Sequence, residues 1–150
     1  MPTKKRKIAA PVAKVWAVLA DFPAIATWAP QVDHSTATTE AHGGIGAVRR
    51  VQVGRIALLE TVVDWRPSSL LSYTVEGLPP IAGSIVTTWQ LADIDGSTKT
   101  TVTTTVASRP NPVSRIVGRA LSRQLGRAAK QMLGGLAARV EAATVEEAAK

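Results

Sequence analysis

The sequence predicts a single α+β domain in which a curved antiparallel sheet of about seven strands wraps around a long C-terminal helix, with two short helices after the first strand. Two observations lead to this prediction. Residues 111–140 keep helical spacing throughout, with apolar side chains on one side and basic side chains opposite. The residues before them form short runs with strand alternation, and hairpin-length turns between these runs make neighbouring strands antiparallel.

The overall composition limits the class of protein. The chain has 150 residues, the size of one ordinary domain, and we expect residues 1–143 to form this domain and residues 144–150 to fray. The absence of cysteine excludes disulfides, thiol catalysis and zinc–thiolate sites. No apolar run reaches the roughly 18 residues that a membrane span needs. Pro11 and Lys14 interrupt the N-terminal stretch that loosely resembles a signal peptide, so we expect a cytoplasmic protein.

The first thirty residues predict one strand and two short helices. Residues 3–9 can form a strand at the edge of the sheet, with charged side chains pointing outward. Pro11 suits the first position of a helix, where its missing N–H is not needed, and this helix should end near Ala20. A second short helix should begin near Pro23 and end before Pro30.

The middle of the chain predicts six further strands, separated by turn residues such as glycine, proline, serine and aspartate. These strands are expected at residues 31–40, 48–53, 55–66, 71–76, 85–91 and 98–107. The glycine-rich segment 42–46 does not predict a phosphate-binding loop, because a strand rather than a helix follows it. Two prolines, Pro110 and Pro112, end the last strand before the long helix.

Strand and helix periodicity predict which side chains face the space between the sheet and the long helix. On residues 55–66, the odd-numbered positions are expected to point inward and the even-numbered positions outward. The predicted lining is Leu59, Val63, Trp65, Tyr73, Val75, Thr87, Trp89 and Thr104 from the sheet, and Leu121, Leu125, Ala128 and Met132 from the helix. Small residues on the helix leave room for a cavity, although the large sheet side chains could instead fill this space as a core.

An unusually apolar loop, residues 77–83, is a candidate gate to this space. Its apolar side chains would be poorly placed in water unless they cover an opening. The residues concerned are Leu78, Pro79, Pro80 and Ile81.

The ionisable side chains predict no catalytic site, metal site or cofactor. Both histidines fall in polar segments where exposure is expected, and two histidines without cysteine make a poor metal site. Glu60 is expected to point outward and to pair with Arg49 or Arg66. If a β-bulge changed the alternation, Glu60 and Arg66 would point inward, and a catalytic role would become the stronger interpretation.

Positive charge is concentrated in the last third of the chain. Between Gly96 and Val140 there are eight lysines and arginines and no acidic residue. Helical spacing places five of them on the face opposite the apolar side chains: Arg115, Arg119, Arg123, Arg127 and Lys130. This basic face is either a solvated helix surface or a surface for an anionic partner. A membrane fits it better than nucleic acid, because no aromatic side chains interleave with the cations for base stacking.

Several local motifs occur within this order of elements. They are Ala10-Pro11, Val15-Trp16, Leu19, Asp21-Phe22-Pro23, Trp28-Ala29-Pro30, Gly43-Gly44, Gly46, Arg49, Glu60, Tyr73, Gly83 and Thr100-Thr101-Val102-Thr103. With these motifs, residues 3–143 resemble the START-like helix-grip superfamily, and within it the polyketide cyclase/dehydrase (SRPBCC) branch. The resemblance implies a cavity between the sheet and the long helix, in which members bind lipids, sterols, hormones, quinones or polyketides. A minority of members catalyse cyclisation or dehydration.

The function expected from the sequence is therefore the binding or carriage of an apolar small molecule in that cavity. One alternative is a polyketide cyclase, aromatase or dehydrase, which would need an ionisable residue inside the cavity. A second alternative is interaction with an anionic membrane or another acidic partner through the basic helix face. The sequence does not indicate the oligomeric state.

Overall fold

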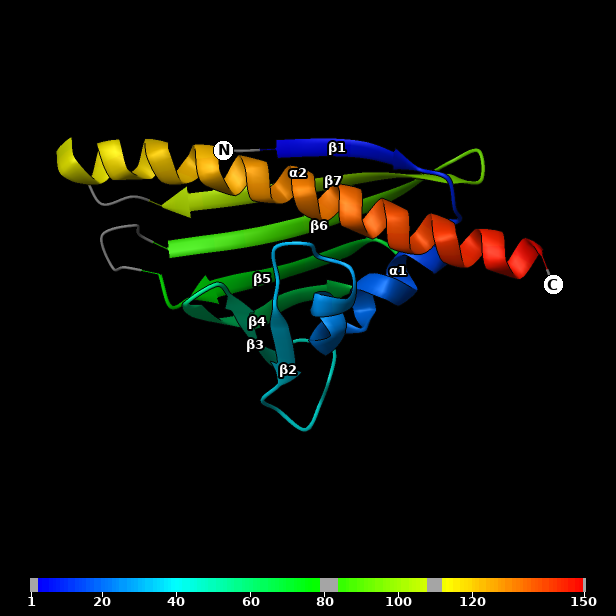
Figure 1. Ribbon diagram of the computed structural model, residues 1–150, viewed down its shortest axis with the longest axis horizontal. Helices are drawn as coiled ribbons and strands as arrows, with labels where there is room; N and C mark the ends of the chain where they lie inside the picture. Colours follow the sequence, from blue (N-terminus) through cyan, green and yellow to red (C-terminus); the bar gives the residue numbers. More distant parts are fainter. Residues whose placement is uncertain (1–2, 79–83, 108–111, 150) are drawn as a thin grey trace.

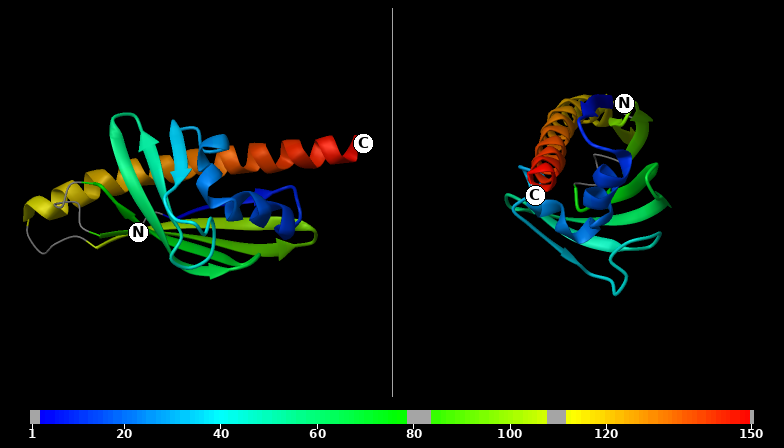
Figure 2. Two further views of the ribbon diagram at one scale, coloured as in Figure 1. Left: turned by 90° about the horizontal axis from the view of Figure 1, so that it is seen from below. Right: turned by 90° about the vertical axis from the view of Figure 1, so that its right-hand side faces the viewer.

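A seven-stranded antiparallel sheet forms the body of the molecule, and one long helix lies across it (Figure 1). The computed structural model describes residues 3–78, 84–107 and 112–149, apart from the side chains of residues 107, 112–118, 121 and 122. Seen end-on, the sheet curves so that the long helix and the two short helices lie on its inner side (Figure 2). The predicted fold class is confirmed.

The elements follow the predicted order. The strands are β1 (Thr3–Ile8), β2 (His34–Ala37), β3 (Val48–Val53), β4 (Ile56–Arg66), β5 (Leu70–Glu76), β6 (Ser84–Ile94) and β7 (Ser97–Ala107), and the helices are α1 (Val12–Ala20), the 3-10 helix η1 (Phe22–Thr27) and α2 (Pro112–Ala148). Across the sheet the order is β1-β7-β6-β5-β4-β3-β2. The first strand therefore pairs with the last, and every other neighbouring pair is consecutive in the sequence.

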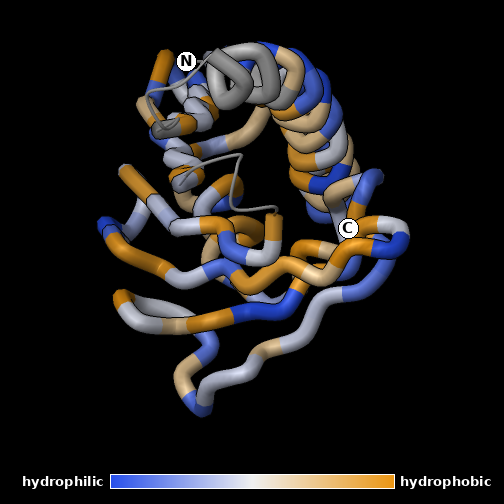
Figure 3. The backbone as a smooth tube through the Cα atoms, turned by 90° about the vertical axis from the view of Figure 1, so that its left-hand side faces the viewer, coloured by the Kyte–Doolittle hydropathy of each residue, from blue (hydrophilic) through white to orange (hydrophobic). Residues whose placement is uncertain are grey.

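The long helix α2 extends further than the sequence predicts. It continues to Ala148, and Lys14 of α1 forms an ion pair of 2.8 Å with Glu147 near its end. The helix thus passes residue 144, where the sequence leads us to expect fraying to begin, and fraying itself stays a prediction. The helix continues this far because alanine and glutamate, which dominate this segment, favour the helical conformation. Hydrophobic and hydrophilic residues alternate along the helix (Figure 3).

An irregularity in β4 changes which side chains face inward. The pairing of β4 with β5 shifts between Val62 and Asp64, as in a β-bulge. An extra residue in one strand reverses the alternation on one side of it. Leu59 and Val63 are consequently 43% and 47% exposed, and the prediction that they face the interior is wrong. The prediction that Glu60 points outward is also wrong, because this side chain is buried.

Aromatic side chains fill one end of the interior. Three edge-to-face pairs join the segment of α1 and η1 to the sheet: Trp16 with Trp65, Phe22 with Tyr73, and Trp28 with Trp89. Their ring centroids are 5.1 to 5.8 Å apart, the range in which aromatic pairs attract each other. The large sheet side chains therefore do form a core, but only around the two short helices.

The long helix approaches the chain after η1 through a glycine. A Cβ atom at Gly135 would overlap the backbone oxygen of Trp28 and lie 2.8 Å from Cδ of Pro30. The neighbouring Gly134 is different, because the nearest atom to its Cβ position is Nη1 of Arg6, 3.9 Å away. Of these two glycines, only Gly135 is therefore required for close packing.

We expect Gly135→Ala to lower the free energy of unfolding by about 1–3 kcal/mol, because backbone atoms cannot rotate away from the added methyl group. Gly134→Ala is the matched control. It should leave stability unchanged or raise it by up to about 1 kcal/mol, since alanine favours the helix. Urea denaturation of both variants measures the difference, and equal stabilities would contradict the close contact.

Candidate functional site

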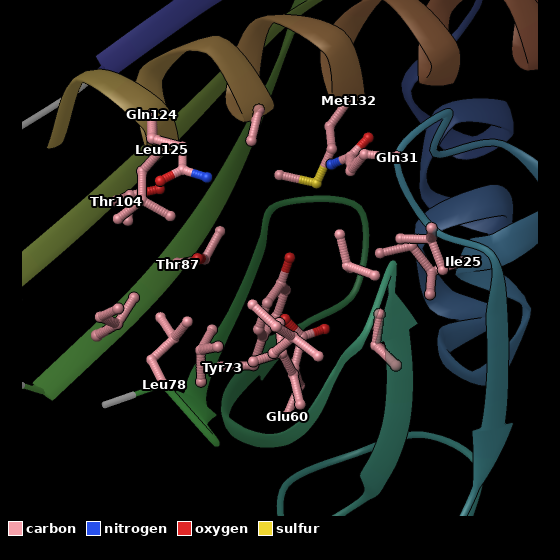
Figure 4. A pocket seen from close by; sticks show the side chains of 18 of the residues that line it. Ile25, Gln31, Glu60, Tyr73, Leu78, Thr87, Thr104, Gln124, Leu125 and Met132 are labelled. Atoms are coloured by element: carbon pink, nitrogen blue, oxygen red, sulfur yellow. The ribbon is translucent and has the colours of Figure 1, made fainter. Parts of the chain in front are cut away.

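A cavity of about 500 Å³ lies between the sheet and α2 (Figure 4). Side chains from five strands, η1, its following loop and α2 contribute to its wall. They are Ile25, Gln31, Val32, Val51, Val53, Ile56, Leu58, Glu60, Tyr73, Val75, Leu78, Ile85, Thr87, Thr104, Ala120, Gln124, Leu125, Ala128 and Met132. Most are apolar, and the volume falls in the range of about 300–1,000 Å³ that is usual for small-molecule sites.

The structure brings together most, but not all, of the predicted lining residues. Tyr73, Val75, Thr87, Thr104, Leu125, Ala128 and Met132 lie on the cavity wall. Trp65 and Trp89 belong to the aromatic core, and Leu59 and Val63 face solvent. The side chain of Leu121 lies outside the described residues. Whether the wall residues contact a ligand remains a prediction.

Two other sets of predicted residues are only partly covered by the structure. Of the candidate gate, Leu78 lies on the cavity wall, whereas Pro79, Pro80 and Ile81 lie outside the described residues. Of the predicted basic face, Arg119, Arg123, Arg127 and Lys130 are exposed on α2, and the side chain of Arg115 is not described.

Sequence reasoning misses several wall residues, chiefly Ile56, Leu58 and Glu60 of β4. Strict alternation through the whole strand assigns them to the outer face. The bulge that reverses this alternation has no glycine or proline to mark it in the sequence. Gln31 and Gln124, both on the wall, are also missed, because polar side chains are not expected in an apolar cavity.

A buried ion pair lies beneath the cavity floor. Arg49 of β3 is 2% exposed, and its Nε and Nη2 atoms each lie 2.8 Å from Oε1 of Glu60. Its Nη1 donates a hydrogen bond of 2.8 Å to the backbone oxygen of Phe22. The guanidinium also lies 3.8 Å from the ring centroid of Phe22 and 4.7 Å from that of Tyr73. Hydrogen bonds and aromatic faces thus compensate for taking this charge out of water.

The Glu60 carboxylate is only half used by this ion pair. Both contacts with Arg49 involve Oε1, and no described residue forms a hydrogen bond with Oε2. Glu60 lies on the cavity wall, beside Tyr73 in the close view (Figure 4). One carboxylate oxygen is therefore free to accept a hydrogen bond or a proton from a molecule in the cavity.

Tyr73 adds a hydrogen-bond donor next to this acceptor. Its hydroxyl accepts a hydrogen bond of 3.2 Å from Nε1 of Trp89, which leaves the hydroxyl proton available to another group. Burial raises the pKa of Tyr73 to about 12, the Glu60 charge acts in the same direction, and Arg49 partly opposes both. Tyr73 is therefore neutral at physiological pH, where it can donate a hydrogen bond but cannot act as a base.

A further acceptor lies on the wall away from the sheet. Oε1 of Gln31 is buried and has no hydrogen-bond partner among the described residues. A buried amide oxygen without a partner destabilises the protein by roughly 1–3 kcal/mol. Gln31, Glu60 and Tyr73 come from separate parts of the chain and converge on the same cavity.

Metal and membrane-spanning features are not found in the part of the chain that the structure describes. There, no group of three or more His, Asp or Glu side chains is arranged to hold a metal ion. In the same residues, no helix is both long enough and apolar enough to cross a membrane.

Comparison with known families decides the classification. A family model described as polyketide cyclase/dehydrase and lipid transport matches residues 3–141. The chain belongs to this family. The predicted resemblance is thereby confirmed over nearly the whole chain. No curated protein sequence matches the chain.

Solved structures agree with the fold of the polyketide cyclase/dehydrase family. The Zhui aromatase/cyclase from Streptomyces sp. R1128 is similar with a TM-score of 0.78 and 21% identity, over 93% of this chain and 92% of that one. A protein from Thermus thermophilus gives a TM-score of 0.76 and 18% identity, over 94% of this chain and 97% of that one. A protein from Thermobifida fusca gives a TM-score of 0.75 and 27% identity, over 93% of both chains.

The buried position of Tyr73 predicts an unusual titration. It is the one tyrosine in the sequence, so phenolate absorbance reports this side chain alone. We expect a midpoint of about 12 in the folded protein, recorded directly after a pH jump, and about 10 in denaturant. Because the fold favours the neutral phenol, the stability that this group contributes is complete below pH 10. It should fall by about 3 kcal/mol in total as the pH rises from 10 through about 12.

The control for this titration is Tyr73→Phe, which should abolish the absorbance change. In this variant the free energy of unfolding should also no longer show the fall above pH 10 that ionisation of Tyr73 causes. A midpoint near 10 in the folded protein would show that the hydroxyl is exposed to water, in conflict with its buried position.

Proposed function

We propose that the protein binds an apolar small molecule in the cavity between the sheet and α2, and carries or senses it. The observation that supports this most directly is the cavity of about 500 Å³, whose wall is mostly apolar and includes a few convergent polar groups. Such a wall stabilises a ligand through burial and orients it through a small number of hydrogen bonds. The family description, which includes lipid transport, is consistent with this function.

The polar groups suggest the form of the ligand. Glu60 and Tyr73 place an acceptor and a donor side by side, and the remainder of the nearby wall is largely aliphatic. A molecule with an apolar body and one hydroxyl or carbonyl end would satisfy both groups. A fully saturated hydrocarbon would offer no partner to Oε2 of Glu60 or to the hydroxyl proton of Tyr73, which disfavours it.

Native mass spectrometry of the purified protein, followed by organic extraction, tests this proposal. We expect an adduct that is lost on denaturation, or a thermal shift with at least one member of a panel of fatty acids, sterols, quinones and aromatic polyketides. Ala128→Phe should weaken binding at least about tenfold, because the added ring occupies the cavity of which Ala128 forms the wall.

Ala138→Phe is the matched control, since Ala138 is exposed on the same helix. This variant should bind as the original protein does. Equal binding by the two variants would show that the ligand lies elsewhere, and no adduct or shift with any compound would contradict the proposal.

A second candidate function is a polyketide cyclase, aromatase or dehydrase. Two buried ionisable groups on the cavity wall, Glu60 and Tyr73, favour it, because an enzyme of this kind needs such groups. Oε2 of Glu60 could take a proton from the carbon between two ketones, while neutral Tyr73 donates a hydrogen bond to the oxygen that gains charge. The Zhui structure is that of an aromatase/cyclase, which agrees with this candidate.

Tyr73→Phe separates catalysis from carriage. If the protein cyclises a poly-β-ketone, the variant should lose about 10²-fold or more in kcat, as enzymes do when an oxyanion-stabilising donor is removed, with little change in KM. Its thermal unfolding should show a retained fold. Equal turnover by the two proteins would exclude the proposed role of Tyr73, and a protein that binds the compound without converting it would be a carrier.

A further inference from the structure

Four exposed cations in the described part of α2 form one continuous row. At 100° per residue, Arg119, Arg123, Arg127 and Lys130 fall within an arc of about 80°. All four are exposed. Gly134 falls within the same arc, so the row leads directly to the place where α2 passes the first strand.

The first strand continues this row. Nη1 of Arg6 lies 3.9 Å from the Cβ position of Gly134. Arg6 and Lys4 are paired in register with Thr100 and Val102, which are fully buried, so both cations emerge on the side of the sheet that α2 covers. Lys4 and Arg6 are themselves exposed. We call Lys4, Arg6, Arg119, Arg123, Arg127 and Lys130 the basic surface.

Among the described residues, no ion pair neutralises a cation of the basic surface. Within the part of the chain that the structure describes, the three ion pairs are Lys14 with Glu147, Arg49 with Glu60, and Arg66 with Asp64. None of them involves the basic surface. Neighbouring exposed cations without carboxylates repel each other, and an anionic partner would remove this repulsion.

The cavity opens beside the basic surface. Residues that line the cavity and are also exposed mark its rim, and on α2 these are Ala120 and Gln124. Each directly follows a member of the basic surface, Arg119 or Arg123. Ile56, at the tip of the β3–β4 hairpin, is a rim residue that is 46% exposed. Of these rim side chains, Ala120 and Ile56 are apolar, and the interfacial region of a bilayer would cover them better than a polar partner.

We propose that the basic surface docks on membranes rich in anionic phospholipids and turns the opening of the cavity toward the bilayer. Charge complementarity supports this partner, because lysines and arginines near an anionic leaflet each contribute to binding. Nucleic acid fits less well, since neither β1 nor α2 carries an aromatic side chain for base stacking. The docking itself does not depend on the proposed function. Only the benefit of turning the cavity toward the bilayer, which is access of a ligand to the cavity, rests on the proposed function.

Vesicle co-sedimentation tests the docking. The protein should bind vesicles of phosphatidylcholine mixed with phosphatidylserine, should not bind phosphatidylcholine alone, and should bind more weakly as salt is added. The combined variant Arg119→Glu, Arg123→Glu and Arg127→Glu should lose binding by at least about tenfold. Its fold should be retained, because all three side chains are exposed.

The matched control reverses three exposed cations elsewhere: Arg50→Glu, Arg66→Glu and Lys99→Glu. Both variants have the same net charge, so the control should keep binding within about twofold if the basic surface is specific. Equal loss in both variants, or no binding of the original protein to the anionic vesicles, would overturn the proposal. Tighter binding to RNA than to vesicles, lost in the first variant, would also overturn it.

One further measurement separates docking from ligand binding. None of the three reversed arginines lines the cavity, so the first variant should retain any ligand seen by native mass spectrometry. Loss of vesicle binding with a retained ligand supports docking as a separate property. Vesicle binding without any ligand would leave docking in place and contradict only the carrier function.

Discussion

The buried ion pair between Arg49 and Glu60 is the constraint on which the interior of this protein depends. It joins β3 to β4, and through the Phe22 carbonyl it joins both strands to η1. A charge with 2% exposure is tolerated only because every part of the guanidinium has a partner, either an oxygen or an aromatic ring. The same ion pair holds the Glu60 carboxylate on the cavity wall, with one oxygen bound to Arg49.

The bulge in β4 determines that this carboxylate faces inward. Without the shift between Val62 and Asp64, inward-facing Trp65 and inward-facing Glu60 could not occur on one strand, because their positions have opposite parity. The irregularity therefore lets β4 contribute an aromatic side chain to the core at one end and a polar group to the cavity at the other. The bulge has a cost, because it leaves the apolar side chains of Leu59 and Val63 exposed to solvent.

The interior is divided rather than uniformly filled or hollow. Aromatic pairs close the end next to α1 and η1, where Gly135 lets α2 approach the backbone of Trp28. Toward the other end, Ala128 and its neighbours on α2 face the aliphatic side chains of the sheet, and the cavity remains. One helix thus holds the core together with its second half and covers the cavity with its first, while its outer side carries the basic row.

Periodicity, turn residues and the motifs around Phe22 and Trp28 are local signals, so the amino-acid sequence alone predicts the order of the elements, the antiparallel sheet, the long helix and the family. It also placed Tyr73, Thr87 and Met132 correctly on the cavity wall, since simple alternation holds there. The inward position of Glu60 and the outward position of Leu59 depend instead on the folded sheet. A bulge is stabilised by the pairing and packing of whole strands, so its position cannot be predicted from the residues of the one strand that contains it.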